Sequence, residues 1–290
     1  MRHTIIRLIG DHLHPSAAVS WQGFNLDFTG VVFDGGNFTG ARFSGGIVRF
    51  NGASFVSGTV SFSRAEFSGG EVGFSGAQFS GGTVDFDHTV FSGGTVDFDH
   101  TVFSGGKVDF SFAKFSGGQV EFDEAEFSGA RIYFAAAEFS GASVYFGSAF
   151  SFAKFSGGQV DFSFAEFSGG QVDLGGAEFT GATVSFSRAR FSGGNVGFSD
   201  AEFSGGNVSF SSAKFSGGSV SFSSAEFSGG QVDFDGAEFS GATVGFGGAK
   251  FSGGEVDISN PADWSHPPKF GWKEAPLGVT LPADADAKQG

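Results

Sequence analysis

Cysteine is absent from this 290-residue chain, and several other residue types are scarce: 1 Met, 2 Tyr, 3 Trp and 6 Pro. Without cysteine, the fold cannot use disulfide bridges, cysteine metal ligands or a thiol nucleophile. A chain that needs no disulfides fits a reducing compartment. We therefore expect a soluble, cytoplasmic protein.

Basic residues are also few, because 16 Lys and Arg face 31 Asp and Glu, for a formal net charge of -15. A surface of that sign repels phosphate backbones, so we expect no direct nucleic-acid binding. No apolar run approaches the roughly 20 residues of a membrane span. The opening segment MRHTIIRLIGDHLHP is too short and too charged to contain the apolar stretch of a signal peptide.

Phenylalanine and glycine dominate instead, with 43 and 51 copies. The unit TVDFDHTVFSGG occurs twice in succession, at residues 83–94 and 95–106. Four phenylalanines open the pattern at intervals of five residues: Phe28, Phe33, Phe38 and Phe43. From Phe50 the intervals alternate between seven and five residues, almost to Ile258. Such a fixed period over most of a chain predicts a repeat architecture.

Each twelve-residue unit contains two short triplets, A-x-F and V-x-F, as in residues 65–67 and 84–86. On an extended strand the first and third side chains share a face, so Ala, Val and Phe point inward and the middle residue points to water. Strands of about three residues are too short for a sandwich. They predict a coil whose successive turns pair as parallel strands, which is a β-solenoid.

Glycine-rich corners follow many of the phenylalanines, with the sequence Ser-Gly-Gly or Ser-Gly-Ala. Glycine permits a positive φ where the chain turns sharply. Alanine replaces the second glycine after Phe127, Phe139, Phe179 and Phe239, whereas the first glycine stays. We therefore expect the first glycine to adopt the more demanding backbone conformation.

The five-residue run at 28–43 and the Ala two positions before Phe resemble the motif of pentapeptide-repeat proteins. The resemblance covers roughly residues 22–259 and implies a right-handed quadrilateral β-helix. This chain departs from the family pattern by inserting two residues at every second side and by favouring Phe over Leu. Members of that family differ in role, and some resemble duplex DNA and inhibit type II topoisomerases.

Two coil sizes fit the spacing of the phenylalanines. Four steps of five residues supply four sides, and stacking the later sides on them gives 24 residues per coil. The alternative is a 12-residue coil with two strands, in which two Phe side chains would overfill a narrow interior. We favour 24, and predict an all-β, right-handed parallel β-helix with about 24 residues per four-sided coil and a short N-terminal helical cap.

Three regions follow from the pattern: an N-terminal helix or cap at 1–21, the β-helix at 22–259, and a C-terminal cap with a disordered tail at 260–290. The apolar residues of the first region recur at helical spacing: Ile5, Ile9 and Leu13. This helix either caps the first coil or docks a partner. Aromatic residues of the last region are expected to lie over the last coil: Trp264, Phe270 and Trp272.

One irregularity interrupts the repeat. After Phe146 the next A-x-F triplet arrives four residues late, at 153–155, which predicts a small loop protruding from a corner. Nearby aromatic residues make this region a candidate protein-binding site: Tyr133, Tyr145, Phe150 and Phe152. Phe112 and Phe164 are further corner aromatics, which either join this cluster or pack on neighbouring corners.

Catalytic and metal-binding chemistry receives little support from the sequence. Outward carboxylates recur at equivalent positions, where we expect a solvated face with no cleft: Asp85, Asp97, Asp109 and Glu121. His88 and His100 are copies in the duplicated unit, and a 24-residue coil places them on different sides. With no third ligand nearby, we predict no metal site, no cofactor and no enzyme.

Outward charges of both signs alternate on one side of the proposed coil, where they can pair across coils: Glu166, Arg190, Lys214 and Glu238. A DNA mimic would show more continuous negative charge. We therefore predict a non-enzymatic scaffold or protein-interaction module with an unknown protein partner, and homodimerisation through one end of the solenoid as an option. The alternative is a DNA-mimicking inhibitor or protector that acts on a type II topoisomerase.

Overall fold

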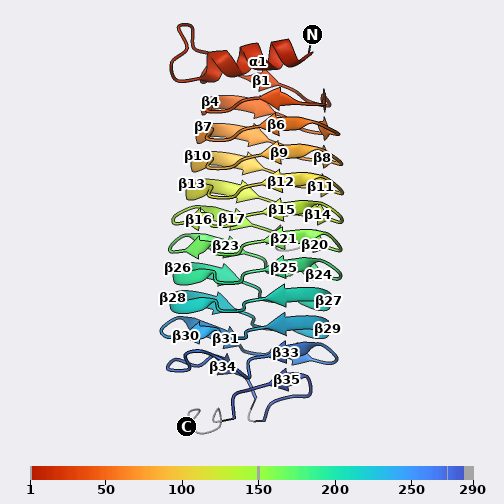
Figure 1. The fold of residues 1–290 in the computed structure, drawn as a ribbon, viewed down its shortest axis with the longest axis vertical. Helices are drawn as coiled ribbons and strands as arrows, with labels where there is room; N and C mark the ends of the chain where they lie inside the picture. Colours follow the sequence, from red (N-terminus) through yellow and green to blue (C-terminus); the bar gives the residue numbers. More distant parts are fainter. Residues whose placement is uncertain (1, 149–150, 273, 284–290) are drawn as a thin grey trace.

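The chain forms a rod of about 10 stacked coils, with the N-terminal helix across one end (Figure 1). The structure is a computed structural model, which describes all residues except 1, 149–150, 273 and 284–290. The predicted disordered tail falls largely on 284–290, outside the described residues. Within the described residues, no helix has the length and apolar character that a membrane crossing requires.

Two parallel sheets form the walls of the rod, and each consists of short strands from successive coils. The 14-stranded sheet comprises β1 (Leu26–Asp27), β4 (Arg42–Arg49), β7 (Glu66–Gly73), β10 (Val90–Asp97), β13 (Lys114–Glu121), β16 (Glu138–Phe139), β17 (Ser143–Tyr145), β22 (Glu166–Phe167), β23 (Gln171–Asp173), β26 (Arg190–Gly197), β28 (Lys214–Ser221), β30 (Glu238–Phe239), β31 (Thr243–Phe246) and β34 (Lys269–Phe270). The 19-stranded sheet comprises β2 (Val32–Phe33), β3 (Gly36–Asn37), β5 (Ser54–Phe55), β6 (Thr59–Ser61), β8 (Gln78–Phe79), β9 (Thr83–Asp85), β11 (Val102–Phe103), β12 (Lys107–Asp109), β14 (Glu126–Phe127), β15 (Arg131–Tyr133), β20 (Lys154–Phe155), β21 (Gln159–Asp161), β24 (Glu178–Phe179), β25 (Thr183–Ser185), β27 (Glu202–Ser209), β29 (Glu226–Asp233), β32 (Lys250–Phe251), β33 (Glu255–Asp257) and β35 (Val279–Thr280).

Strand register confirms the 24-residue coil and excludes the 12-residue alternative. Phe67 of β7 pairs with Phe91 of β10, and Phe91 pairs with Phe115 of β13, so each partner lies 24 residues further along the chain. Only two coils depart from this length. The first coil has 22 residues, because Phe33 pairs with Phe55, and the coil with the predicted irregularity has 28, because Phe127 pairs with Phe155.

The inward phenylalanines form four columns that run the length of the rod. Column 1 contains Phe28, Phe50, Phe74, Phe98, Phe122, Phe146, Leu174, Phe198, Phe222, Phe246 and Phe270. Column 2 contains Phe33, Phe55, Phe79, Phe103, Phe127, Phe155, Phe179, Phe203, Phe227 and Phe251. Column 3 contains Phe38, Phe62, Phe86, Phe110, Phe134, Phe162, Phe186, Phe210, Phe234 and Ile258. Column 4 contains Phe43, Phe67, Phe91, Phe115, Phe139, Phe167, Phe191, Phe215 and Phe239.

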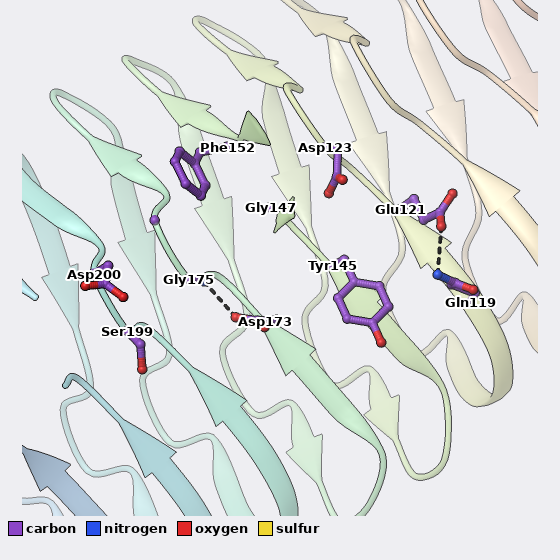
Figure 2. Close-up of a pocket in the computed structure, with 11 residues that line it drawn as sticks. Gln119, Glu121, Asp123, Tyr145, Gly147, Phe152, Asp173, Gly175, Ser199 and Asp200 are labelled. Atoms are coloured by element: carbon purple, nitrogen blue, oxygen red, sulfur yellow. Dashed lines mark hydrogen bonds between the residues drawn. The ribbon is translucent and has the colours of Figure 1, made fainter. Parts of the chain in front are cut away.

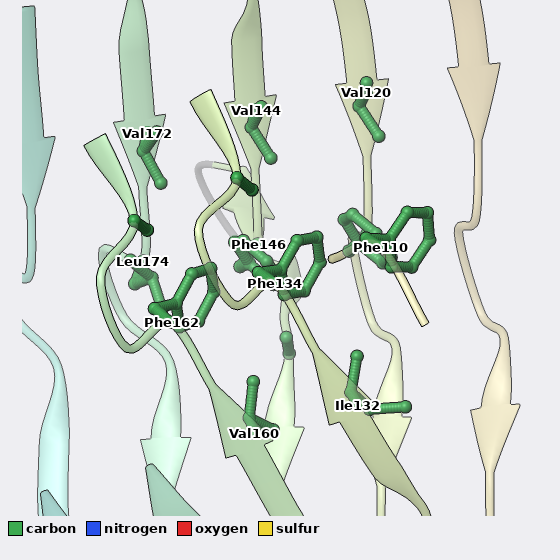
Figure 3. Packing of buried hydrophobic residues seen from close by; sticks show 14 of the residues in the cluster. Phe110, Val120, Ile132, Phe134, Val144, Phe146, Val160, Phe162, Val172 and Leu174 are labelled. Atoms are coloured by element: carbon green, nitrogen blue, oxygen red, sulfur yellow. The ribbon is translucent and has the colours of Figure 1, made fainter. Parts of the chain in front are cut away.

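Rings within a column lie almost parallel. Phe98 stacks on Phe74 with ring centroids 4.7 Å apart and on Phe122 at 4.8 Å. Columns 1 and 3 meet edge to face across the centre of the coil, as Phe98 and Phe110 do at 6.0 Å and 85°. Figure 3 shows these columns around Phe134, together with Leu174, which takes the place of a ring in column 1. Columns 1 and 3 therefore face opposite edges of the rod.

Tight corners follow columns 1 and 3, and each contains a residue with positive φ. Arg64 has φ 57° and lies in a turn that the amide N–H of Ala65 closes by donating to the carbonyl of Phe62 over 2.9 Å. Equivalent corners place eleven non-glycine residues in this left-handed region: Arg64, His88, His100, Phe112, Glu124, Ala136, Phe164, Arg188, Asp200, Ser212 and Ser224. Because that conformation is uncommon outside glycine, close coil stacking must maintain it at these corners.

The Ser-Gly-Gly corners differ from the prediction in which glycine has the demanding backbone. At the corner that ends β10's first half, the second glycine, Gly94, has φ 72°, whereas the first, Gly93, lies outside the left-handed region. A Cβ on Gly93 would instead lie 2.9 Å from the carbonyl oxygen of Ser68 in the coil before it. The first glycine is therefore required by close approach of two backbones, and the prediction from φ was wrong.

Both ends of the rod are covered. Helix α1 (Arg2–Leu13) buries Ile6 and Leu13 against the first coil, whereas Ile5, which the helical pattern placed on the buried face, is 54% exposed. At the other end, Trp264 packs edge to face on Phe239 with ring centroids 5.4 Å apart. Phe270 and Trp272 also lie on rings of the last coil, as the sequence predicts.

Replacing Phe98 by Ala tests the column packing. The side chain is fully buried, so removing the ring is expected to lower the free energy of unfolding by about 3–5 kcal/mol. The matched control is Phe112→Ser, because Phe112 is an exposed corner residue and Ser occupies the equivalent corner position at 212. That control should change the free energy by less than about 0.5 kcal/mol in chemical denaturation. Equal losses would contradict the assignment of the core.

Gly105→Ala tests the first-glycine argument. A Cβ at this position would lie 2.6 Å from the carbonyl oxygen of Ser80, so neighbouring coils must separate and we expect a loss of about 3 kcal/mol. Gly76→Ala is the control, since it has positive φ but open space around it, and it should cost about 1 kcal/mol. A larger loss for Gly76→Ala in the same denaturation experiment would show that φ, not backbone contact, is limiting.

Candidate functional site

The late triplet forms a short hairpin that projects from a column-1 corner. Strand β18 (Gly147–Ser148) pairs antiparallel with β19 (Ser151–Phe152), and Gly147 faces Phe152. Chain pairing resumes when the amide N–H of Ala153 donates to the carbonyl of Phe146 over 2.8 Å. The predicted protruding loop is thus confirmed, and it leaves the core register intact on both sides.

A groove runs beside this hairpin along the outer face of the 14-stranded sheet (Figure 2). Its volume is about 640 Å³, whereas the sequence predicted no cleft on any carboxylate-bearing face. The inserted hairpin accounts for the difference, because it adds a wall to a face that is otherwise flat. The groove is lined by Gln119, Glu121, Asp123, Tyr145, Gly147, Phe152, Asp173, Gly175, Gly176, Ser199 and Asp200.

Two aromatic side chains contribute the apolar part of the groove. Tyr145 lies between Glu121 and Asp173, its register neighbours in the coils before and after it. Phe152 extends from the hairpin over the corner of the next coil, where a Cβ on Gly176 would lie within clashing distance of the ring. Gly176 also has φ 68°. Glycine is therefore required there twice, by its backbone conformation and by the ring above it.

Hydrogen bonds position the carboxylates around these rings. Asp173 accepts from the amide N–H of Gly175 at 2.8 Å, and Glu121 accepts from the side-chain amide of Gln119 at 2.7 Å. The amide N–H of Asp123 donates to the carboxylate of Asp99 over 2.9 Å. The Oδ1 atom of Asp123 is buried and has no hydrogen-bond partner among the described residues. The groove thus presents acceptors that a donor from outside could satisfy.

Three carboxylates at one end of the groove perturb one another. Burial, followed by the Asp97 carboxylate, raises the pKa of Asp99 to about 6. Burial also raises the pKa of Asp97, with a further rise from Glu71 and an opposing effect of the Asp99 amide. The pKa of Glu121 is raised by burial and then by the charge of Asp97. These groups therefore favour proton uptake or a cationic neighbour.

The same three residues could gather around a cation. Asp97, Asp99 and Glu121 each offer a carboxylate oxygen, and these atoms lie within 4.8 Å of one another. Oxygen ligands of this kind suit hard cations such as Ca²⁺ or Mg²⁺. They are only partly buried, and proton uptake relieves the same repulsion. Sequence analysis missed the cluster, although Asp97 and Glu121 lie one 24-residue coil apart.

The structure separates the predicted site residues. Tyr145 and Phe152 share the groove, whereas Tyr133 lies on the 19-stranded sheet, where the Lys107 ammonium sits 5.1 Å from its ring centroid. Phe150 falls outside the described residues. Phe112 and Phe164 lie at column-3 corners, on the opposite edge of the rod from the groove, and do not join its aromatic residues.

The two histidines of the duplicated unit also lie apart, as the 24-residue coil predicts. His88 is at a column-3 corner, where its ring contacts the carboxylate of Asp87 at 2.8 Å. His100 is at a column-1 corner and contacts Glu124 of the next coil at 3.1 Å. They therefore provide no shared ligand set.

Comparisons with known proteins agree with the residue pattern. Residues 28–72 match the family model for pentapeptide repeats (9 copies), which confirms the resemblance. HetL, a pentapeptide repeat protein involved in heterocyst differentiation regulation from the cyanobacterium Nostoc sp., is 18% identical over 82% of this chain and 91% of its own, with a TM-score of 0.30. Trypsin-treated QnrB1, a plasmid-mediated fluoroquinolone resistance protein, is 20% identical over 81% of this chain and 90% of its own, with a TM-score of 0.28. No curated protein matches the sequence.

Asp99→Asn tests the carboxylate cluster through the pH dependence of stability. Because the folded-state pKa of Asp99 is about 6 and the unfolded value is about 3.9, the folded state binds more protons between these pH values, and stability falls as pH rises through that window. The amide of Asn keeps the acceptor for Asp123 but carries no charge. We expect the variant to be more stable than the parent by about 1 kcal/mol at pH 7.5, a figure reduced for solvent screening.

The advantage of the variant should vanish near pH 4, where Asp99 is protonated in both states of the parent. Thermal or chemical unfolding across pH 4 to 8 measures it. A variant that is less stable than the parent at pH 7.5, or equally shifted at every pH, would contradict the raised pKa.

Proposed function

We propose that this pentapeptide-repeat solenoid is a non-enzymatic protein-interaction module that holds a basic segment of a partner protein in the groove beside Tyr145. The observation that carries the proposal is the position of the Tyr145 ring between two carboxylates, Glu121 and Asp173, in a groove with an aromatic wall. Aromatic residues flanked by polar groups are the residues that most often anchor protein interfaces.

The shape of the groove suits one or two side chains of a partner. Its volume of about 640 Å³ falls within the range of ordinary ligand pockets. Phe152 and Tyr145 offer ring faces to the aliphatic stem or the charged head of a Lys or Arg. The hairpin that carries Phe152 is the only insertion into the coil repeat in the described residues, so the groove is a local feature on an otherwise regular surface.

Charge selects a basic occupant. Four carboxylates line the groove, and the buried Oδ1 of Asp123 has no partner among the described residues. The net charge of -15 would also steer a cationic segment toward the rod. The pKa values of Asp99 and Glu121 point the same way, because a cation nearby would relieve the repulsion that raises them.

Catalysis by these carboxylates is less well supported. General acid and base pairs depend on environments that push two pKa values apart. Here Asp97, Asp99 and Glu121 all have pKa values shifted upward for the same reason, which is burial beside other carboxylates. The described part of the groove supplies no arrangement of a nucleophile with a base.

DNA mimicry also receives less support than protein binding. The outward row of the 14-stranded sheet alternates in sign, and its charges neutralise one another across coils. Its ion pairs are Arg42–Glu66 at 2.8 Å, Lys114–Glu138 at 3.2 Å and Lys214–Glu238 at 2.8 Å. A homodimer formed end to end is disfavoured because both ends carry covers of their own, including Leu13 and Trp264.

Replacing Tyr145 by Ser tests the proposed groove. We would measure fluorescence anisotropy of a labelled peptide that alternates Lys and Gly, at low and at physiological salt. Loss of the ring is expected to weaken binding about tenfold, the effect of removing one aromatic anchor. Asp123→Asn should weaken binding and reduce its salt dependence, because one carboxylate is lost.

Tyr133→Ser is the matched control, since Tyr133 has an equivalent outward position on the other sheet and does not line the groove. It should bind the peptide like the parent protein. Equal weakening by both tyrosine substitutions, or none by Tyr145→Ser, would refute the groove as the binding site.

A further inference from the structure

A ladder of basic and aromatic residues occupies successive column-3 corners, on the edge opposite the groove. Six consecutive coils contribute to it: Arg64, His88, Phe112, Ala136, Phe164 and Arg188. Backbone hydrogen bonds fix their order, since the amide N–H of Phe112 donates to Ala135 at 3.0 Å and that of Ala136 donates to Ser163 at 2.9 Å. The side chains therefore lie one above another along the rod.

The two phenylalanines of this ladder each have one face covered by the chain itself. The His88 ring stacks on Phe112 with centroids 5.0 Å apart and 21° between the planes. The Arg188 guanidinium carbon lies 5.4 Å from the centroid of Phe164. Even so, Phe112 is 52% exposed and Phe164 is 55% exposed. Their other faces point toward the coil of Ala136.

Ala136 leaves a gap of one ring in this stack. In the core of the same coil, Phe134 lies between Phe110 at 4.8 Å and Phe162 at 4.7 Å. At the corner the equivalent place between Phe112 and Phe164 is occupied only by a methyl group. Among the described residues, no ring or cationic group stacks on either phenyl from that side. The gap therefore has the width that a planar group takes up between two stacked rings.

We propose that this gap, the Phe112–Phe164 slot, binds the guanidinium group of an arginine from a partner protein. The chain itself shows the compatible chemistry, because Arg188 already stacks on the far face of Phe164. A guanidinium is planar and can stack on an aromatic face, whereas an ammonium is not planar.

Acidic residues lie on both sides of the slot. Asp161 precedes Phe164 by three residues on β21, and Glu166 follows it by two on β22. Glu138 and Glu166 are register neighbours, so two carboxylates stand side by side near Ala136. Glu138 pairs with Lys114, but Glu166 has no ion pair among the described residues. A cationic group in the slot would therefore meet unneutralised negative charge.

The backbone at these corners favours the assignment. Phe112 has φ 57° and Phe164 has φ 61°, a conformation that bulky residues rarely adopt. Glycine takes the equivalent corner at Gly40 and Gly236. The two phenylalanines thus stand where glycine would fold with less strain, and they contribute nothing to the buried core. A role on the surface accounts for their presence.

Titration with acetyl-arginine-amide tests the slot, monitored by backbone amide NMR shifts of Phe112, Ala136 and Phe164 in the full chain. We expect saturable shifts in the millimolar range and at least about tenfold weaker binding of acetyl-lysine-amide. The double variant Phe112→Ala, Phe164→Ala should weaken arginine binding about tenfold as well. Tyr145→Ser should leave it unchanged, because the groove lies on the opposite edge.

Ala136→Phe is the decisive variant, because it fills the gap while retaining both rings. Phe is tolerated at this corner, as positions 112 and 164 show, so an unchanged unfolding midpoint is expected. This variant should show no saturable shift. Arginine binding that survives in Ala136→Phe, equal binding of the lysine probe, or tighter binding of acetyl-tyrosine-amide would each overturn the proposal.

Discussion

Face-to-face contact between phenylalanines of successive coils is the interaction on which the rest of this rod depends. Parallel strands lie about 4.8 Å apart, and the rings stack at nearly the same distance, as Phe98 does on Phe74 at 4.7 Å. One ring per strand therefore fills the interior without gaps or overlap. A larger or smaller side chain at every step would not match the strand spacing, which explains why one residue type recurs at so many inward positions.

The matched spacing also determines how surface sites arise. Because the core holds every coil in register, outward residues 24 positions apart form rows along the rod, and the chemistry of a face depends on where a row is interrupted. The hairpin of β18 and β19 interrupts one edge and creates the groove of Tyr145 and Phe152. At the opposite edge, Ala136 interrupts a row of larger side chains. Each candidate site is thus a local exception to a regular lattice.

Much of the fold could be predicted from the spacing of phenylalanines, because each inward ring marks one side of the coil. The four five-residue steps indicated four sides, and the late triplet after Phe146 indicated the insertion. The groove could not be predicted in the same way, since it depends on where the hairpin lies relative to Tyr145. Nor does the sequence distinguish the two corner glycines, because the contact between Gly93 and the Ser68 carbonyl joins different coils.

The duplicated unit at 83–94 and 95–106 is one half of a coil. Unequal recombination between such copies would lengthen or shorten the gene in steps of one unit. Gain or loss of a single unit would rotate every later coil by half a turn relative to the N-terminal helix, and would transfer later surface residues to the opposite edge. Gain or loss of two units would preserve their orientation. Lineages that retain an oriented binding edge should therefore vary in length by whole coils.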